Sequence, residues 1–156
     1  MDAVIKSSDL TIGIDIGGTK ISAGVVDSSG NIIDSSRIST PAEGGKELIL
    51  AVINLIKELK EKHEIKGIGI SIAALISSDY GTIVGAPNIA NLSKLNFVNE
   101  IKAEFKLPIV VENDANSAMW AEFKFGNAKG LNPVMFFIIG TGVGGGIVID
   151  GKLHRG

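Results

Sequence analysis

Two short turns of glycine and threonine are the first residues of this sequence with an evident chemical use. Gly17-Gly18-Thr19-Lys20 and Gly140-Thr141-Gly142 each interrupt a segment rich in isoleucine and valine. Because glycine has no Cβ, neighbouring backbone N–H groups can converge, and such a nest binds a phosphate oxygen. The threonine hydroxyl adds a donor, and we expect Lys20 to reach a phosphate rather than solvent. Two such turns facing each other would hold one polyphosphate from both sides.

The two turns belong to longer segments that resemble each other. Three residues of the first segment recur with the same spacing in the second: Gly18, Thr19 and Gly24 correspond to Gly140, Thr141 and Gly146. Both segments predict a strand, a turn and a second strand. We favour an internal duplication, and the alternative is a coincidence between two glycine-containing β-hairpins.

Two other glycine motifs are excluded. The segment Gly140–Gly145 fits the pattern GxGxxG, but a dinucleotide fingerprint needs a helix next and an acidic residue about 20 positions on. Residues 146–149 predict a strand, and Asp150 follows at once. The sequence contains no GxxxxGK[ST] phosphate loop either.

Asp15 lies directly before the first turn, between two isoleucines. A carboxylate beside a phosphate nest is repulsive unless a divalent cation lies between them, which is the arrangement that Mg²⁺ and ATP need. A carboxylate among buried strand residues is also costly without a partner. We therefore favour a metal-organising role for Asp15 over a solvated residue at the end of a strand.

Asp114 lies where an apolar strand is expected to end and a helix to begin, in Glu112-Asn113-Asp114-Ala115-Asn116. A helix N-terminus favours an ionised carboxylate, which can act as a general base toward a hydroxyl group. The alternative is that Asn113 or Asp114 only caps the helix. The spacing does not decide between these interpretations.

The elements that would position these residues follow an α/β order. Apolar periodicity predicts strands over 10–16, 20–26, 31–38, 67–73, 82–85, 108–112, 134–139 and 143–149. It predicts helices from about 48 to 63, over 93–105 and over 113–125, the last ending at Gly126. This order indicates a mixed sheet with helices packed on it.

The composition excludes several kinds of partner and site. The 156 residues are 45% hydrophobic and 21% charged, with a net charge of −2 and no cysteine. The charge gives no reason to bind nucleic acid or a membrane, and neither disulfides nor thiolate metal sites can form. No signal peptide opens the sequence, and no apolar run approaches the ~20 residues of a membrane helix. We expect a cytoplasmic protein.

The segments Gly13–Lys20, Glu112–Asn116 and Gly140–Gly146 together resemble, in order and spacing, the ROK family of bacterial and archaeal sugar kinases and repressors. The resemblance covers nearly the whole chain. It implies an actin-like (ribonuclease H-like) ATPase fold with two lobes, and ATP and a sugar bound between them. The first lobe would span 1–126, and 127–156 would be the opening β-hairpin of a second lobe that is truncated there.

The resemblance also assigns roles to residues. Asp114 would deprotonate the 6-hydroxyl of the sugar for attack on the γ-phosphate of ATP. Asn113, and more weakly Asn88 in the loop Gly85-Ala86-Pro87-Asn88, would contact the sugar. Asp15 would organise Mg²⁺, and the two turns would hold the phosphates.

The chain departs from the family pattern in two ways. Ala73-Ala74 stands where family members usually have Pro-Gly, which bears on the identity of the sugar. The Glu and His pair, the cysteine-rich zinc site and most of the ATP lobe of family kinases have no counterpart before Gly156, so we expect little turnover from these residues alone. We also expect the hairpin 132–153 to hide Phe136, Phe137 and Ile139 by pairing with another copy or packing on the first lobe.

We therefore expect an ATP-dependent hexose kinase of the glucokinase type, which forms a homo-oligomer. One alternative is a sugar-sensing repressor module without its DNA-binding domain. Another is a different actin-like protein, such as an acetate kinase relative or a chaperone fragment, without sugar binding. His63 and His154 have no second ligand at a useful spacing, so we expect surface positions rather than metal ligands.

Overall fold

The computed structural model describes residues 9–77, 82–93, 95–139 and 142–155. They form two compact units, Met1–Glu112 and Asn113–Gly156, and each is described by itself. These units differ from the predicted lobes, 1–126 and 127–156, chiefly in the helix Asp114–Phe125, which belongs to the second unit. The division into lobes stays a prediction.

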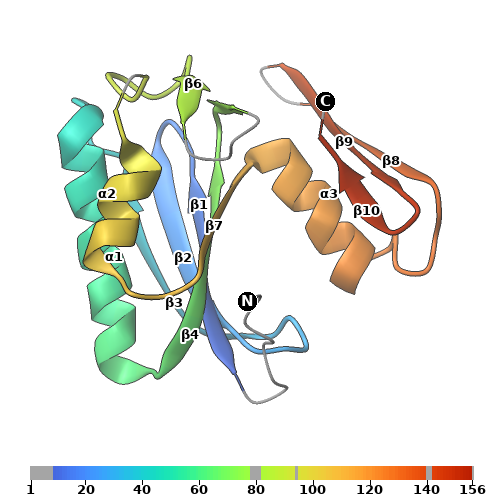
Figure 1. Ribbon diagram of the computed structural model, residues 1–156, viewed down its shortest axis with the longest axis horizontal. Coiled ribbons are helices and arrows are strands. Elements are labelled where there is room, and N and C mark those ends of the chain that lie inside the picture. Colours follow the sequence, from blue (N-terminus) through green and yellow to red (C-terminus); the bar gives the residue numbers. More distant parts are fainter. Residues whose placement is uncertain (1–8, 78–81, 94, 140–141, 156) are drawn as a thin grey trace. The chain divides into compact units, whose positions relative to one another are not determined.

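The first unit is built on a mixed sheet of five strands in the order β3-β2-β1-β4-β7 (Figure 1). Strand β1 runs antiparallel to β2 and parallel to β4, and β2 runs antiparallel to β3. The mixed α/β sheet expected from the sequence is therefore confirmed. The strands span Leu10–Ile16 (β1), Lys20–Val26 (β2), Ile32–Ser39 (β3), Ile65–Ile72 (β4) and Ile109–Asn113 (β7).

One face of this sheet carries the core. Ile12, Ile14 and Ile16 alternate along β1 and are at most 3% exposed. Helices α1 (Gly45–Lys62) and α2 (Phe97–Glu104) contribute to the same core and lie on one side of the sheet (Figure 1). The predicted apolar stripe of α1 is buried as expected, through Leu48, Val52, Leu55, Ile56 and Leu59.

Strand alternation turns the other half of the strand residues to the opposite face, and at the centre of the sheet these residues are small or polar. Gly13 on β1 lies between Gly24 on β2 and Gly69 on β4. Asp15 lies between Ser22 and Ser71 in the same way. The predicted site residue Asp15 therefore shares a row with two hydroxyl groups.

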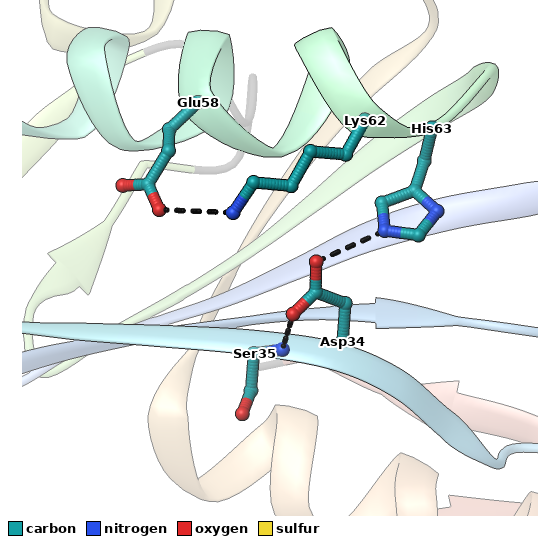
Figure 2. Close-up of polar contacts among 5 residues, drawn as sticks. All are labelled: Asp34, Ser35, Glu58, Lys62 and His63. Atoms are coloured by element: carbon teal, nitrogen blue, oxygen red, sulfur yellow. Dashed lines mark hydrogen bonds and ion pairs between the residues drawn. The ribbon is translucent and has the colours of Figure 1, made fainter.

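Helix α1 ends at Lys62, and the residue after it ties the helix to the sheet (Figure 2). The Nε2 atom of His63 lies 3.0 Å from Oδ2 of Asp34 on β3. The side chain of His63 is only 21% exposed. His63 was expected at a surface position rather than as a metal ligand, and the structure adds a carboxylate partner that the sequence does not reveal, because Asp34 is 29 positions away. His154, in contrast, is exposed as expected.

The second unit packs helix α3 on a three-stranded antiparallel sheet of order β10-β9-β8. Met119 of α3 is fully buried against Val148, with Phe136 alongside. The helix lies close to β9, since a Cβ on Gly146 would meet the Cβ of Met119 at 2.6 Å. These elements span Asp114–Phe125 (α3), Val134–Ile139 (β8), Val143–Ile149 (β9) and Lys152–His154 (β10).

The hairpin β8–β9 is therefore not isolated, because β10 extends its sheet and α3 packs on it. Phe136 packs against the cluster around Met119 of α3, and α3 lies within the predicted first lobe, 1–126, so for Phe136 the expected packing on that lobe is confirmed. Phe137 and Ile139 point to the other face and are 65% and 82% exposed. Gly144 and Gly146 allow α3 to approach the sheet, so part of the glycine run serves packing.

The remaining differences concern short elements. Helix α2 begins at Phe97 and not at 93, because Leu92 and Leu95 form a turn before it. Strand β6 (Ile83–Gly85) confirms the expected short strand and pairs with β5 (Leu75–Ile76). None of the helices in the described ranges combines the length and the apolar character that crossing a membrane requires.

Candidate functional site

The first predicted phosphate turn joins β1 and β2. The N–H of Gly17 donates to the carbonyl oxygen of Lys20 at 3.0 Å and closes the turn. Within the described residues, the N–H groups of Gly18 and Thr19 have no hydrogen-bond partner. Thr19 and Lys20 are both exposed. The turn thus presents unpaired donors to solvent, as a phosphate nest requires.

Two segments from elsewhere in the first unit hold this turn. Thr40 donates its N–H to the carbonyl of Thr19 at 3.1 Å and its hydroxyl to the carbonyl of Gly17 at 2.7 Å. On another side, a Cβ on Gly18 would lie 2.6 Å from the carbonyl oxygen of Asn88. The structure therefore brings together the predicted phosphate turn and the predicted sugar residue Asn88.

Asp15 is exposed, on the face opposite the buried Ile14 and Ile16. Its Oδ1 accepts a hydrogen bond of 3.1 Å from the hydroxyl of Ser71. Asp15 is therefore not a costly buried carboxylate, as the sequence suggested, because strand alternation turns it to the face opposite the core. Its role toward a metal depends instead on its position one residue from the turn.

The donor set around Asp15 suits a Mg²⁺ ion that arrives with a nucleotide. Mg²⁺ keeps several waters and binds one or two carboxylates together with substrate phosphates. Asp15 supplies one carboxylate, with the hydroxyls of Ser22 and Ser71 on its two sides. In the described part of the chain no three His, Cys, Asp or Glu residues gather as a metal site. These residues therefore fit a Mg²⁺ ion that is bound jointly by the protein and the nucleotide phosphates, and not one that is bound by protein ligands alone.

Asn113 and Asp114 form the start of α3. The side-chain Oδ1 of Asn113 accepts from the N–H groups of Ala115 and Asn116, at 3.0 and 3.2 Å, so Asn113 is the N-cap. Oδ1 of Asp114 accepts from Nδ2 of Asn113 and from the N–H of Ala115, both at 2.9 Å. The capping interpretation is thus confirmed for Asn113. It leaves Oδ2 of Asp114 without a hydrogen bond from any described residue.

The second predicted turn is described only in part. Gly140 and Thr141 lie outside the described residues. Gly142 is exposed, and a Cβ built on it would meet no atom within 4 Å. The strands on either side pair as an antiparallel hairpin, as β1 and β2 do. This agrees with the two strand–turn–strand segments expected from the sequence.

Sequence reasoning missed Thr40 and Ser71. Thr40 lies 23 positions from Gly17, and Ser71 lies 56 positions from Asp15. For Ser71 a signal existed, because aligning the alternating runs of β1 and β4 places Ser71 beside Asp15. Thr40 follows β3 immediately, and no spacing in the sequence marks it.

The chain matches the ROK family model over residues 11–156. It is 44% identical over 147 residues to the glucokinase of Streptomyces coelicolor, covering 94% of this chain and 46% of that protein. It is 36% identical over 145 residues to the N-acetylmannosamine kinase of Yersinia pseudotuberculosis, covering 93% of this chain and 49% of that protein.

A solved structure shows the same similarity in three dimensions. The ROK family glucokinase from Streptomyces griseus, in complex with glucose and AMPPNP, matches with a TM-score of 0.86 and 40% identity. The match covers 94% of this chain and 46% of that one, so the chain spans about half the length of these relatives. ROK kinases have the actin-like ATPase fold, which confirms the predicted fold class. With the family model matching nearly end to end, the chain belongs to the ROK family.

Proposed function

We propose that the protein phosphorylates the 6-hydroxyl of a glucose-like hexose with ATP. The observation that carries the proposal is the turn Gly17–Lys20, closed by its own hydrogen bond and presenting the unpaired N–H groups of Gly18 and Thr19. Such a turn suits the phosphates of a nucleotide. Lys20 and the second turn, Gly140–Gly142, would add contacts to the same phosphates.

Asp114 is the proposed general base. A proton passes from the sugar hydroxyl to Oδ2, the hydroxyl oxygen attacks the γ-phosphorus, and ADP leaves. Two hydrogen bonds hold Oδ1 of Asp114, so the carboxylate has a fixed orientation. Phosphoryl transfer depends mainly on positioning and charge neutralisation, and the base adds to these.

Asp15 is the residue that would hold Mg²⁺, which when bound neutralises charge on the phosphates. Asn88 and Asn113 are the proposed sugar contacts. Asn88 lies against the phosphate turn, and Asn113 holds the base. The named relatives act on glucose and on N-acetylmannosamine, and the higher identity to the glucokinase favours glucose.

We also propose that the chain self-associates. Met135, Phe137 and Ile139 alternate along β8 and are 59%, 65% and 82% exposed. Three such side chains on one face would be buried by a second copy. Sedimentation equilibrium should give a dimer or larger species that Phe137→Asp converts to a monomer, and a monomeric wild type would contradict this. A reaction that uses Mg²⁺-bound ATP suits the cytoplasm.

The decisive experiment is a coupled ADP-release assay with Mg²⁺, ATP and a panel of hexoses, comparing wild type with Asp114→Asn. We propose that residues 1–156 alone bind AMPPNP but turn over little, and that turnover needs a chain of the length of the named relatives, of which these residues span about half. A sugar-sensing repressor module would bind sugar without releasing ADP, and Asp114→Asn would then change nothing. If neither wild type nor Asp114→Asn binds sugar and nucleotide, the proposal is overturned.

A further inference from the structure

Thr40 makes two hydrogen bonds to the phosphate turn from outside it. It follows the last residue of β3, Ser39, and is half-buried. Its hydroxyl donates to the carbonyl oxygen of Gly17 at 2.7 Å, and its N–H donates to the carbonyl oxygen of Thr19 at 3.1 Å. Both accepting carbonyls flank Gly18. Thr40 is not part of the glycine turn Gly17–Lys20, so the turn's own sequence does not predict a role for Thr40 in binding a ligand.

The bond to Gly17 determines where the next N–H points. A peptide unit is planar and trans, so the carbonyl of Gly17 and the N–H of Gly18 belong to one plane and point in opposite directions. Thr40 draws the carbonyl toward itself, and the N–H of Gly18 must then point away from Thr40. That N–H has no partner among the described residues.

The other restraints on the turn do not supply this orientation. The hydrogen bond from the N–H of Gly17 to the carbonyl of Lys20 closes the turn but leaves the Gly17–Gly18 peptide plane free to rotate. The carbonyl of Asn88 limits the space beside the Cα of Gly18. Glycine on both sides of that peptide bond imposes little preference of its own. The hydroxyl of Thr40 is thus the contact that fixes the plane.

We propose that Thr40 is a positioning residue for nucleotide phosphates: its hydroxyl holds the Gly17–Gly18 peptide so that the N–H of Gly18 points to a phosphate oxygen. The inference rests on the proposed function and concerns the same site. Threonine suits the role because its β-branch restricts χ1 and keeps the hydroxyl in place.

The test compares Thr40→Val, which removes only the hydroxyl, with Thr40→Ser, which retains it. Thr11→Val is the matched control, because the hydroxyl of the half-buried Thr11 also donates to a backbone carbonyl of the sheet, that of Val26 at 3.4 Å. Binding of magnesium tripolyphosphate is measured by calorimetry. The amide signal of Gly18 is followed by ¹H–¹⁵N spectroscopy in the same titration.

Thr40→Val should weaken tripolyphosphate binding about three- to tenfold, the effect of one lost hydrogen bond. Its Gly18 signal should shift in the absence of ligand and respond less to tripolyphosphate. Thr40→Ser and Thr11→Val should bind like wild type. Glucose affinity should be unchanged in Thr40→Ser and Thr11→Val.

Each other outcome overturns a specific step. Equal binding by Thr40→Val and wild type refutes the role of Thr40 and leaves the phosphate site intact. If Thr40→Val does not fold, the test rests on Thr40→Ser, which retains the hydroxyl. A loss of tripolyphosphate affinity of fivefold or more in Thr40→Ser would then refute the role of the hydroxyl. If wild type itself neither binds tripolyphosphate nor shifts the Gly18 signal, the proposed phosphate site fails and the role of Thr40 fails with it.

Discussion

The carbonyl oxygen of Asn88 lies so close to Gly18 that a Cβ on Gly18 would sit 2.6 Å from it. Gly18 belongs to the proposed phosphate turn and Asn88 to the proposed sugar loop. A displacement of one segment must therefore be accommodated by the other. This contact gives a direct route by which an occupied phosphate turn could affect sugar binding.

Gly18→Ala should consequently impair both ligands. The added methyl group meets a backbone oxygen, which cannot rotate away as a side chain can, so the loop around Asn88 must shift. We expect a loss of about 1–3 kcal/mol in the free energy of unfolding, as for other overpacked sites. Weaker glucose and tripolyphosphate binding should accompany it. Urea unfolding and calorimetry measure these effects.

Gly69→Ala is the matched control for this substitution. Gly69 lies in β4, and a Cβ there meets no atom within 4 Å. It should leave stability and both affinities close to wild type. If Gly18→Ala behaves like Gly69→Ala, the contact with Asn88 has no mechanical consequence.

Asp114→Asn should separate catalysis from folding. Asparagine can still accept the hydrogen bonds at Oδ1 but cannot take a proton, and the N-cap Asn113 is unchanged. We expect kcat to fall about 10²- to 10⁴-fold, with glucose binding nearly retained. Asn113→Ala provides the contrast, because loss of the cap should cost about 1 kcal/mol of stability. Full activity in Asp114→Asn would disprove the assignment of the base.

Ser71→Ala should raise the Mg²⁺ concentration that half-saturates the reaction. Removing the hydroxyl frees Oδ1 of Asp15, and the carboxylate then has more orientations to lose when the metal binds. Thermal stability should change little because Asp15 is exposed. Ser22→Ala is the control: the hydroxyl of Ser22 accepts from Nε of Arg37 at 3.2 Å. Equal effects of the two substitutions would show that the bond to Asp15 is not the cause.

These results also show which features the sequence could reveal. Alternating isoleucines predict the strands because burial of one face requires a period of two, and this signal is local. The glycine turn and the strand-to-helix junction at Asp114 could also be predicted, because each is marked by residues that are adjacent in the sequence. The three-residue strand β10 was missed, since it is too short to show a period.

The contacts that hold the site are not local. Thr40 with Gly17, Ser71 with Asp15 and Asn88 with Gly18 each join segments brought together only by the fold. Thr40 and Ser71 are of ordinary residue types, and in the sequence either would pass as a surface polar residue. The expectation that Asp15 is buried was wrong for a related reason. Its sequence neighbours Ile14 and Ile16 are buried, but they point to the other face of the sheet.

The pair of Asp34 and His63 makes stability depend on pH (Figure 2). The hydrogen bond from His63, then that from the N–H of Ser35 and the charge of Lys62, hold the pKa of Asp34 below its ordinary value of 3.8. A lowered pKa means that the unfolded chain takes up the proton first as the pH falls. The stabilisation is therefore present in full above that ordinary value and is lost as the pH falls through the lowered one.

Asp34→Asn should accordingly lower the urea midpoint at neutral pH, and the gap to wild type should close as the pH falls from roughly 5 to below the ordinary range of an aspartate. Glu58→Gln is the control, since Glu58 forms a surface pair with Lys62, with side chains 49% and 54% exposed. Such a pair contributes little at any pH. A gap between Asp34→Asn and wild type that stays constant down to acid pH would mean that the ionised carboxylate of Asp34 does not stabilise the fold through His63.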